Sequence, residues 1–212
     1  MTMKKTTIFL AFLLLGATLN MSAQQPNKKK KTFEEKVSKF VKQTKKELEQ
    51  AGHELGDAIG FDDRIGGKSD LLKVNGSFYM PLYSKDLYKG EDALTYRKAC
   101  TQQFRKKYPK VSIQSVTIPQ KEWVLETVEK GGELVGYQRT LHCFIIARDG
   151  EEGYVNAKFT YRQYKNVGQE FQNVKGWWPK WERTDFMTNS VYEQLLKLKN
   201  YEFLEIAVWK QG

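Results

Sequence analysis

Residues 134–165 read LVGYQRTLHCFIIARDGEEGYVNAKFTYRQYK, and this stretch decides the fold. Two strand-like runs, 134–147 and 154–165, flank the glycine-containing segment DGEEG at 149–153. Leu141, Cys143 and Ile145 share one face of the first predicted strand, and His142 falls on the other. Short glycine-rich segments of this kind connect antiparallel strands. The stretch therefore predicts a β-hairpin within a meander of antiparallel strands.

The segments on either side of this hairpin predict the rest of the domain. A Pro follows the first strand and the first helix of this region, and glycine-rich turns separate the strands that come next. The expected elements are a strand at 71–80, a helix at 91–108, strands at 111–118, 123–128, 134–147 and 154–165, a helix at 189–199 and a strand at 203–209. The order β-α-β-β-β-β-α-β predicts an α+β domain over residues 67–212, an antiparallel sheet with helices packed on one face.

A long amphipathic helix is expected before this domain. Thr32 and Glu35 have the spacing of a capping box, and apolar residues recur at steps of three and four from Phe33 to about Ile59. Gly60 is a suitable stop for this helix. The segment QQPNKKKK at 24–31 precedes it and is typical of a flexible basic linker. Residues 24–66 are therefore expected to form a basic linker and a helix.

The first 23 residues have the pattern of a secretory signal peptide. Lys4 and Lys5 precede an apolar run from Ile8 to Ala17, and the small pair Ser22–Ala23 follows as a cleavage site. Ten apolar residues are about half of what a helix needs to cross a bilayer, and no cysteine is present for a lipid anchor. We expect residues 1–23 to be removed, and the mature chain to be periplasmic or extracellular with no transmembrane span.

The positive charge of the chain is concentrated directly after this leader. The formal net charge is +10, and the segment 24–50 holds nine lysines against four glutamates. Export makes nucleic acid an improbable partner, so an anionic envelope polymer or lipid surface, or an envelope protein, is the functional expectation. A solvated face that aids solubility is the alternative interpretation.

Cys100 and Cys143 are the only two cysteines. An oxidising compartment and an even count are consistent with a disulfide between them. Two buried free thiols that pack as small apolar side chains are the alternative. Spacing alone does not distinguish these two states, because a disulfide has strict geometric requirements.

Part of the domain resembles a known group of proteins. The segment 123–164 contains the hairpin EKGGELVG at 129–136, the tetrad ARDG at 147–150 and the basic–aromatic strand FTYR at 159–162. With the order of elements, this segment resembles the small TATA-box-binding-protein-like folds of uncharacterised exported bacterial proteins. The resemblance covers about half of the domain. It implies a helix-plus-sheet fold, and it implies no activity, because those families have none established.

The sequence contains no concentrated catalytic motif. There is no His-Glu-x-x-His helix, nucleophile elbow, phosphate loop or Cys-x-x-Cys pair, and the chain has only two histidines. His142 and Cys143 are adjacent on a strand, so they point to opposite faces and do not form a nucleophile–base pair. The acid pairs Asp62–Asp63 and Glu151–Glu152 fall in expected loops. We therefore predict no catalytic residue, no metal site and no cofactor.

The most unusual local composition is GWWPKW at 176–181. Trp177, Trp178 and Trp181 are candidate ligand-binding residues, because Trp presents a large apolar face to a sugar ring or a peptide. The alternative is that these rings cover part of the sheet, and buried rings would exclude a ligand platform.

Together these features predict an exported cell-envelope protein that acts as a non-enzymatic binding or interaction module. An envelope hydrolase acting on cell-wall or polysaccharide substrates is the alternative function. Such an enzyme would show a pocket that joins two carboxylates, or a histidine with Cys143.

Overall fold

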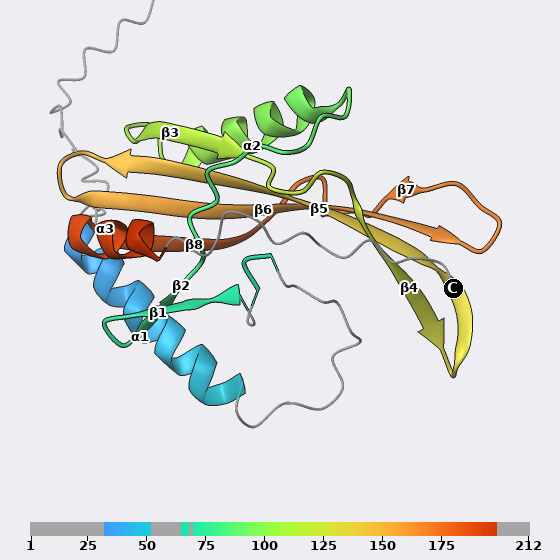
Figure 1. Cartoon of the computed structure of the whole chain (residues 1–212), viewed down its shortest axis with the longest axis horizontal. Helices are drawn as coiled ribbons and strands as arrows, with labels where there is room; N and C mark the ends of the chain where they lie inside the picture. Colours follow the sequence, from blue (N-terminus) through green and yellow to red (C-terminus); the bar gives the residue numbers. More distant parts are fainter. Residues whose placement is uncertain (1–31, 52–64, 68–69, 199–212) are drawn as a thin grey trace, which may run out of the picture. The chain divides into compact units, whose positions relative to one another are not determined.

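The central element of the fold is the pairing of two long strands, β5 (Glu133–Asp149) and β6 (Gly153–Asn166). The computed structural model describes residues 32–51, 65–67 and 70–198. The antiparallel register of the two strands is unbroken from Gly136 opposite Asn166 to Asp149 opposite Gly153. Both strands follow the sequence expectation closely, and the predicted hairpin is confirmed (Figure 1).

Four shorter strands complete a six-stranded antiparallel sheet. On one side of the ribbon, β3 (Ser112–Thr117) and β4 (Val124–Lys130) pair with successive parts of β5. On the other side, β7 (Gln172–Asn173) and β8 (Lys180–Thr188) pair with successive parts of β6. The ends of β5 and β6 that carry β4 and β7 extend past the end of α2 (Figure 1).

One face of the sheet is covered by helix α2 (Ala93–Lys107). Tyr96, Cys100 and Phe104 recur at a spacing of four residues, so they form the buried stripe of the helix. They belong to one hydrophobic cluster with every second residue of β5 and β6, a set that includes Cys143 and Phe159. This cluster is the main core of the molecule.

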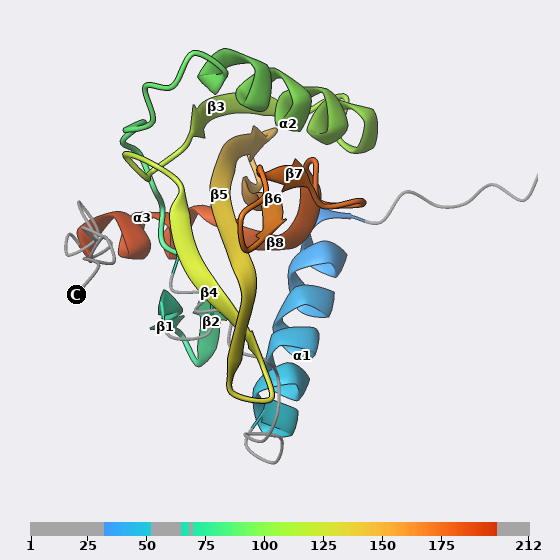
Figure 2. The ribbon, with the colours of Figure 1, turned by 90° about the vertical axis from the view of Figure 1, so that its right-hand side faces the viewer.

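The other face carries two helices and a small hairpin. Helix α1 (Phe33–Ala51) contacts the β1 (Leu72–Val74) and β2 (Ser77–Tyr79) hairpin, where the rings of Phe40 and Tyr79 lie 5.4 Å apart. Helix α3 (Asn189–Lys197) buries Val191 and Leu195 beside Met187 of β8. Figure 2 shows α1, β1 and β2 on the side of the sheet opposite α2.

Two local predictions about α1 can be compared with its contacts. The capping box is confirmed, since the Glu35 amide donates to Thr32 Oγ1 at 3.3 Å and the Thr32 amide donates to Glu35 Oε2 at 3.2 Å. Lys36 forms an ion pair with Asp149 at the end of β5, with 2.7 Å between Nζ and Oδ2. The helix is therefore packed and paired against the same body that contains the sheet.

The expected α+β class and antiparallel sheet are confirmed, with a different distribution of the helices. Instead of gathering on one face, α2 covers one face and α1 and α3 contact the other. The physical reason lies in the middle of β5, where residues 140–147 are all buried. A strand that is buried on both sides needs cover on both sides.

Two segments differ from their predicted structure. The expected strand at 71–80 is the β1–β2 hairpin, because Asn75 and Gly76 have φ of 49° and 77° and form its turn. Residues 180–188, directly before the helix predicted at 189–199, form strand β8, which was not among the expected elements. Four segments with predictions lie outside the described residues. They are the expected strand at 203–209, the expected helical residues beyond 51, residues 1–31 and the pair Asp62–Asp63. Within the described part of the chain, no helix has the length and apolar character of a membrane span.

The packing of α2 predicts a specific loss of stability. Phe104 is completely buried, so Phe104→Ala removes a ring from the main core and should lower the free energy of unfolding by about 3–5 kcal/mol. Leu94→Ala on the same helix is the matched control, because 56% of the Leu94 side chain is exposed. Urea unfolding of both variants measures the difference. Equal, small losses would contradict the packing of α2 against the sheet.

Candidate functional site

The three tryptophans singled out by their composition do not form one platform. Trp181 is half-buried and packs against the main core, with its ring centroid 4.8 Å from that of Phe159 and 5.8 Å from that of Phe104. Trp178 packs nearby against Tyr161 and Tyr96, at 5.1 and 5.4 Å. These two rings cover the sheet beside α2, which was the alternative interpretation of the segment.

Trp177 is placed differently. The guanidinium of Arg162 lies 3.4 Å from the centroid of its ring, and the ammonium of Lys180 lies 3.8 Å from it. Arg162 pairs with Thr140 in the β5–β6 register, so its side chain is on the face opposite Tyr161. Trp177 is half-buried. It remains a candidate contact residue, separate from the other two tryptophans.

A larger set of aromatic and basic side chains lies at the end of the sheet beyond α2. Arg139 of β5 lies over two rings, 4.9 Å from the centroid of Trp123 and 4.3 Å from that of Phe171. Lys165 of β6 lies 4.8 Å from Phe171 and 5.5 Å from Tyr137. The five residues alternate cation and ring and are all half-buried. We call Trp123, Arg139, Phe171, Lys165 and Tyr137 the cation–aromatic ladder.

The ladder is held in place by amide side chains. Arg139 Nε donates to Gln163 Oε1 at 2.6 Å, and Gln163 Nε2 donates to Asn173 Oδ1 at 2.7 Å. These contacts connect β5, β6 and β7 across the sheet. They use one nitrogen of the guanidinium, and within the described part of the chain the Nη groups of Arg139 and the Nζ of Lys165 have no carboxylate partner.

The strand positions directly beside Arg139 and Tyr137 carry no carboxylate. The register places Leu125 and Thr127 of β4 beside Arg139 and Tyr137, and Gln163 and Lys165 of β6 on their other side. None of these strand positions is a carboxylate. The nearest acid on β4, Glu126, pairs with Gln138 and so belongs to the opposite face. The ladder is therefore a basic surface with aromatic rings between its charges.

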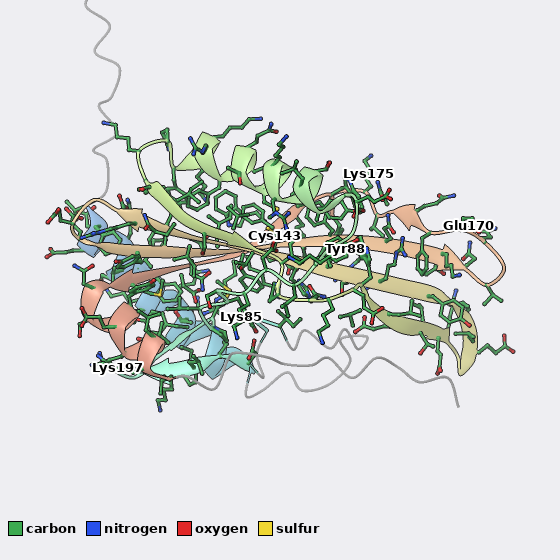
Figure 3. The ribbon with its side chains drawn as sticks, turned by 45° about the horizontal axis from the view of Figure 1, so that its top comes forward. Lys85, Tyr88, Cys143, Glu170, Lys175 and Lys197 are labelled. Atoms are coloured by element: carbon green, nitrogen blue, oxygen red, sulfur yellow. The ribbon has the colours of Figure 1, made fainter. Side chains whose placement is uncertain are left out.

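A shallow polar groove of about 220 Å³ adjoins the ladder at the β6–β7 hairpin. Its lining is rich in amides and also contains one base and one acid: it includes Tyr164, Lys165, Asn166, Gln169, Glu170, Gln172 and Asn173. Figure 3 shows Glu170 and Lys175 at this end of the sheet. Amide groups both donate and accept hydrogen bonds, so the groove offers partners for hydroxyl groups next to the basic and aromatic surface.

The ladder was not identified from the sequence. The basic–aromatic strand at 159–162 is visible in the sequence, but Trp123, Phe171 and Lys165 are distant from one another in the chain. One sequence signal could have indicated part of the ladder. Tyr137 and Arg139 are two residues apart, as are Gln163 and Lys165, so each pair lies on one face of its strand. The cross-strand register that joins the two pairs is not visible from one strand alone.

The two cysteines are brought together in the core. Cys100 and Cys143 are free thiols, both completely buried in the main hydrophobic cluster. The neighbouring Cys100 thiol, followed by burial, raises the pKa of Cys143. A protonated, inaccessible thiol is a poor nucleophile, so the pair has the chemistry of a core element and not of a catalytic cysteine.

His142 lies on the face opposite Cys143, as the sequence predicts. Its Nδ1 is 2.8 Å from Thr160 Oγ1, and that hydroxyl donates to Glu182 Oε2 at 2.5 Å. Glu182 also lies 3.4 Å from the buried ammonium of Lys158. Burial, followed by the positive charges of Lys158 and Arg162, lowers the pKa of His142 well below its ordinary value. The imidazole is therefore a neutral part of a buried polar network.

The remaining candidate groups do not combine into a site. Glu151 and Glu152 are exposed in the turn between β5 and β6. Among the described residues, no group of three or more His, Cys, Asp or Glu side chains has the arrangement of a metal site.

Comparison of the chain with protein-family models, curated proteins and solved structures finds no match. The resemblance to TATA-box-binding-protein-like exported proteins therefore stays a prediction.

The neutral state of His142 predicts a dependence of stability on pH. Because its pKa is lower in the folded state than its ordinary value of 6.5, the unfolded chain binds more protons below that pH. The free energy of unfolding should fall as the pH decreases below about 6.5, and the slope from this group should approach about 1.4 kcal/mol per pH unit at lower pH.

Urea unfolding between pH 7.5 and about 5.5 measures this slope. The His142→Gln variant keeps a polar side chain and removes the titration, so its stability should change less over the same range. The assignment would be wrong if both proteins showed the same slope.

Proposed function

We propose that this protein is an exported cell-envelope protein that acts as a non-enzymatic binding module, and that the cation–aromatic ladder binds an anionic polysaccharide. The observation that carries the proposal is the composition of one face. Arg139 and Lys165 are the charged groups at the ladder's strand positions, and no carboxylate on these positions neutralises them. A ligand with negative charge supplies the missing partners.

The geometry of Arg139 favours carboxylate groups in particular. Its Nε is occupied by Gln163, and this contact orients the planar guanidinium. The Nη groups are left for a ligand, and a guanidinium held in this way matches the two oxygens of a carboxylate. Lys165 adds a second positive charge on the adjacent strand. Two cations on adjacent strands favour a ligand that carries repeated acidic groups.

The rings between the cations favour a sugar over a simple anion. Trp123, Phe171 and Tyr137 are half-buried, so each presents part of a ring at the surface. An aromatic face provides a flat apolar contact for a pyranose ring, while the neighbouring amide groove provides hydrogen bonds for hydroxyl groups. A uronic-acid polysaccharide combines these three chemical features.

The N-terminal sequence supports the location of this activity. The leader pattern at 1–23 favours export, where acidic polysaccharides are accessible partners. Helix α1 also carries positive charge that would attract an anionic ligand. Its exposed lysines are Lys39, Lys42, Lys45 and Lys46. These lysines add long-range attraction for a polyanion, and salt weakens such attraction.

The alternative of an envelope hydrolase has less support from the ladder. Glycoside hydrolysis requires two carboxyl groups on either side of the scissile bond. The strand positions of the ladder supply hydrogen-bond donors and rings, with no acid pair. The geometry therefore favours binding over cleavage at this surface.

Binding is tested with the mature chain, residues 24–212, and soluble polygalacturonate as the probe. The Arg139→Gln, Lys165→Gln double variant should bind at least about tenfold more weakly, because charge-assisted hydrogen bonds contribute about 1.5–3 kcal/mol each. Isothermal titration calorimetry measures the affinity, with a neutral glucan as the second ligand. We expect little binding of the glucan.

The control variant is Arg105→Gln, Lys106→Gln, which removes the same charge from the exposed end of α2. It should lose only the general electrostatic part of the affinity. Equal losses in the two double variants would show that net charge, and not the ladder, accounts for binding. Absence of binding by the unmodified chain at low salt would contradict the proposal for this ligand.

Export is tested separately by expressing the full chain in a bacterial host. Cleavage after Ala23 should give a mature protein that begins at Gln24, as the order of charged, apolar and small residues predicts. N-terminal sequencing of the protein in the exported fraction measures the cleavage site. Intact full-length chain confined to the cytoplasm would contradict the export part of the proposal.

A further inference from the structure

We propose that Cys100 and Cys143 form a disulfide in the exported protein and join α2 covalently to the middle of the sheet. This inference rests on the export part of the proposed function and is independent of the ligand. Figure 3 shows Cys143 in the central region of the sheet, and Cys100 belongs to the buried stripe of α2.

The contacts of the two thiols support this pairing. Both side chains have no exposed surface, and both belong to the hydrophobic cluster between α2 and the sheet. Cys100 Sγ also lies 3.3 Å from the hydroxyl of Tyr161, which donates to the carbonyl of Tyr96 at 2.7 Å. These contacts hold Cys100 toward β5 and β6, on the side where Cys143 lies.

The chain offers neither cysteine another cysteine with which to form a disulfide. No third cysteine is present, so mispairing within the chain does not arise. Within the part of the chain that the structure describes, no cluster of ligating side chains adjoins the pair to form a metal site. The burial that makes Cys143 a poor nucleophile also protects a completed disulfide from reductants.

The bond would form by thiol–disulfide exchange during folding. One cysteine, as a thiolate, attacks the disulfide of an oxidising protein in the exported compartment, and one sulfur of that protein leaves. The second cysteine then attacks the mixed disulfide and releases the other sulfur. The pair loses two protons and two electrons, and the oxidising protein gains them as two thiols. Because both cysteines become buried, exchange precedes the packing of α2.

The consequence is a stronger attachment of α2. The helix has four buried residues, and one of them is Cys100. The bridge would close a loop between positions 43 residues apart, and a loop of this length restricts the unfolded chain substantially. We expect reduction to lower the midpoint of thermal unfolding by roughly 10 °C.

The redox state is tested on the chain exported through its own leader. The protein is denatured without reductant in excess N-ethylmaleimide, and its intact mass is measured. The expected mature chain carries no adduct and is two hydrogen atoms lighter than the dithiol, and prior reduction gives two adducts. Two adducts without prior reduction would overturn the proposal.

A second experiment tests the disulfide independently of export. Residues 24–212 are refolded in a buffer of reduced and oxidised glutathione and analysed in the same way. A dithiol product would overturn the pairing even where export holds. A disulfide product would support it even where the leader is not cleaved.

Thermal unfolding gives the structural readout. The Cys100→Ala, Cys143→Ala double variant is the control, because its midpoint should not respond to reductant, while that of the oxidised protein should fall. An equal response of both proteins to reductant would show that the stabilisation does not come from the bond.

Discussion

The continuous register between β5 and β6 is the constraint on which the rest of the structure depends. Fourteen consecutive residue pairs join the two strands, from Gly136–Asn166 to Asp149–Gly153. Since side chains alternate across a strand, this single register assigns every residue of both strands to one of two faces. A shift by one residue would exchange the apolar set that contacts α2 with the polar set that includes His142 and Lys158.

One face of this ribbon changes character along its length. Under α2 it presents Ile145, Cys143 and Leu141, which are completely buried. Beyond α2 the same face continues with Arg139 and Tyr137 and becomes the cation–aromatic ladder. The proposed binding surface is thus an extension of the core face past the helix that covers it, and the core beneath α2 holds the surface strands in register.

The sequence was most informative where local patterns determine local structure. Periodicity and spacing predict three features that the structure contains. These are the long hairpin, the capping box at Thr32 and Glu35, and the placement of His142 and Cys143 on opposite faces of β5. It was less informative where a residue's position depends on distant segments. The cover on both faces of β5 and the packing of Trp178 and Trp181 beside α2 arise from tertiary contacts, which a single strand pattern does not contain.

The cation–aromatic ladder also depends on contacts between distant segments, which the sequence does not reveal. Tyr137 and Arg139 are neighbours on one strand, but Phe171 and Trp123 reach them from other parts of the chain. In the segment GWWPKW, the half-buried rings of Trp178 and Trp181 pack against the core. Trp177 lies on the opposite face from the ladder's strand residues. Aromatic density in sequence was therefore a weaker indicator of a surface site than the alternation of rings and cations across strands.

The most direct test of the central claim is a nuclear magnetic resonance titration of the mature chain with a short oligogalacturonate, observed at the tryptophan indole N–H signals. The account predicts that the signal of Trp123, which lies in the ladder, shifts progressively with added ligand, while that of Trp181, which packs against Phe159 in the core, stays unchanged. A titration in which the Trp123 signal does not move, or in which both signals move equally, would contradict the assignment of the ladder as the binding surface.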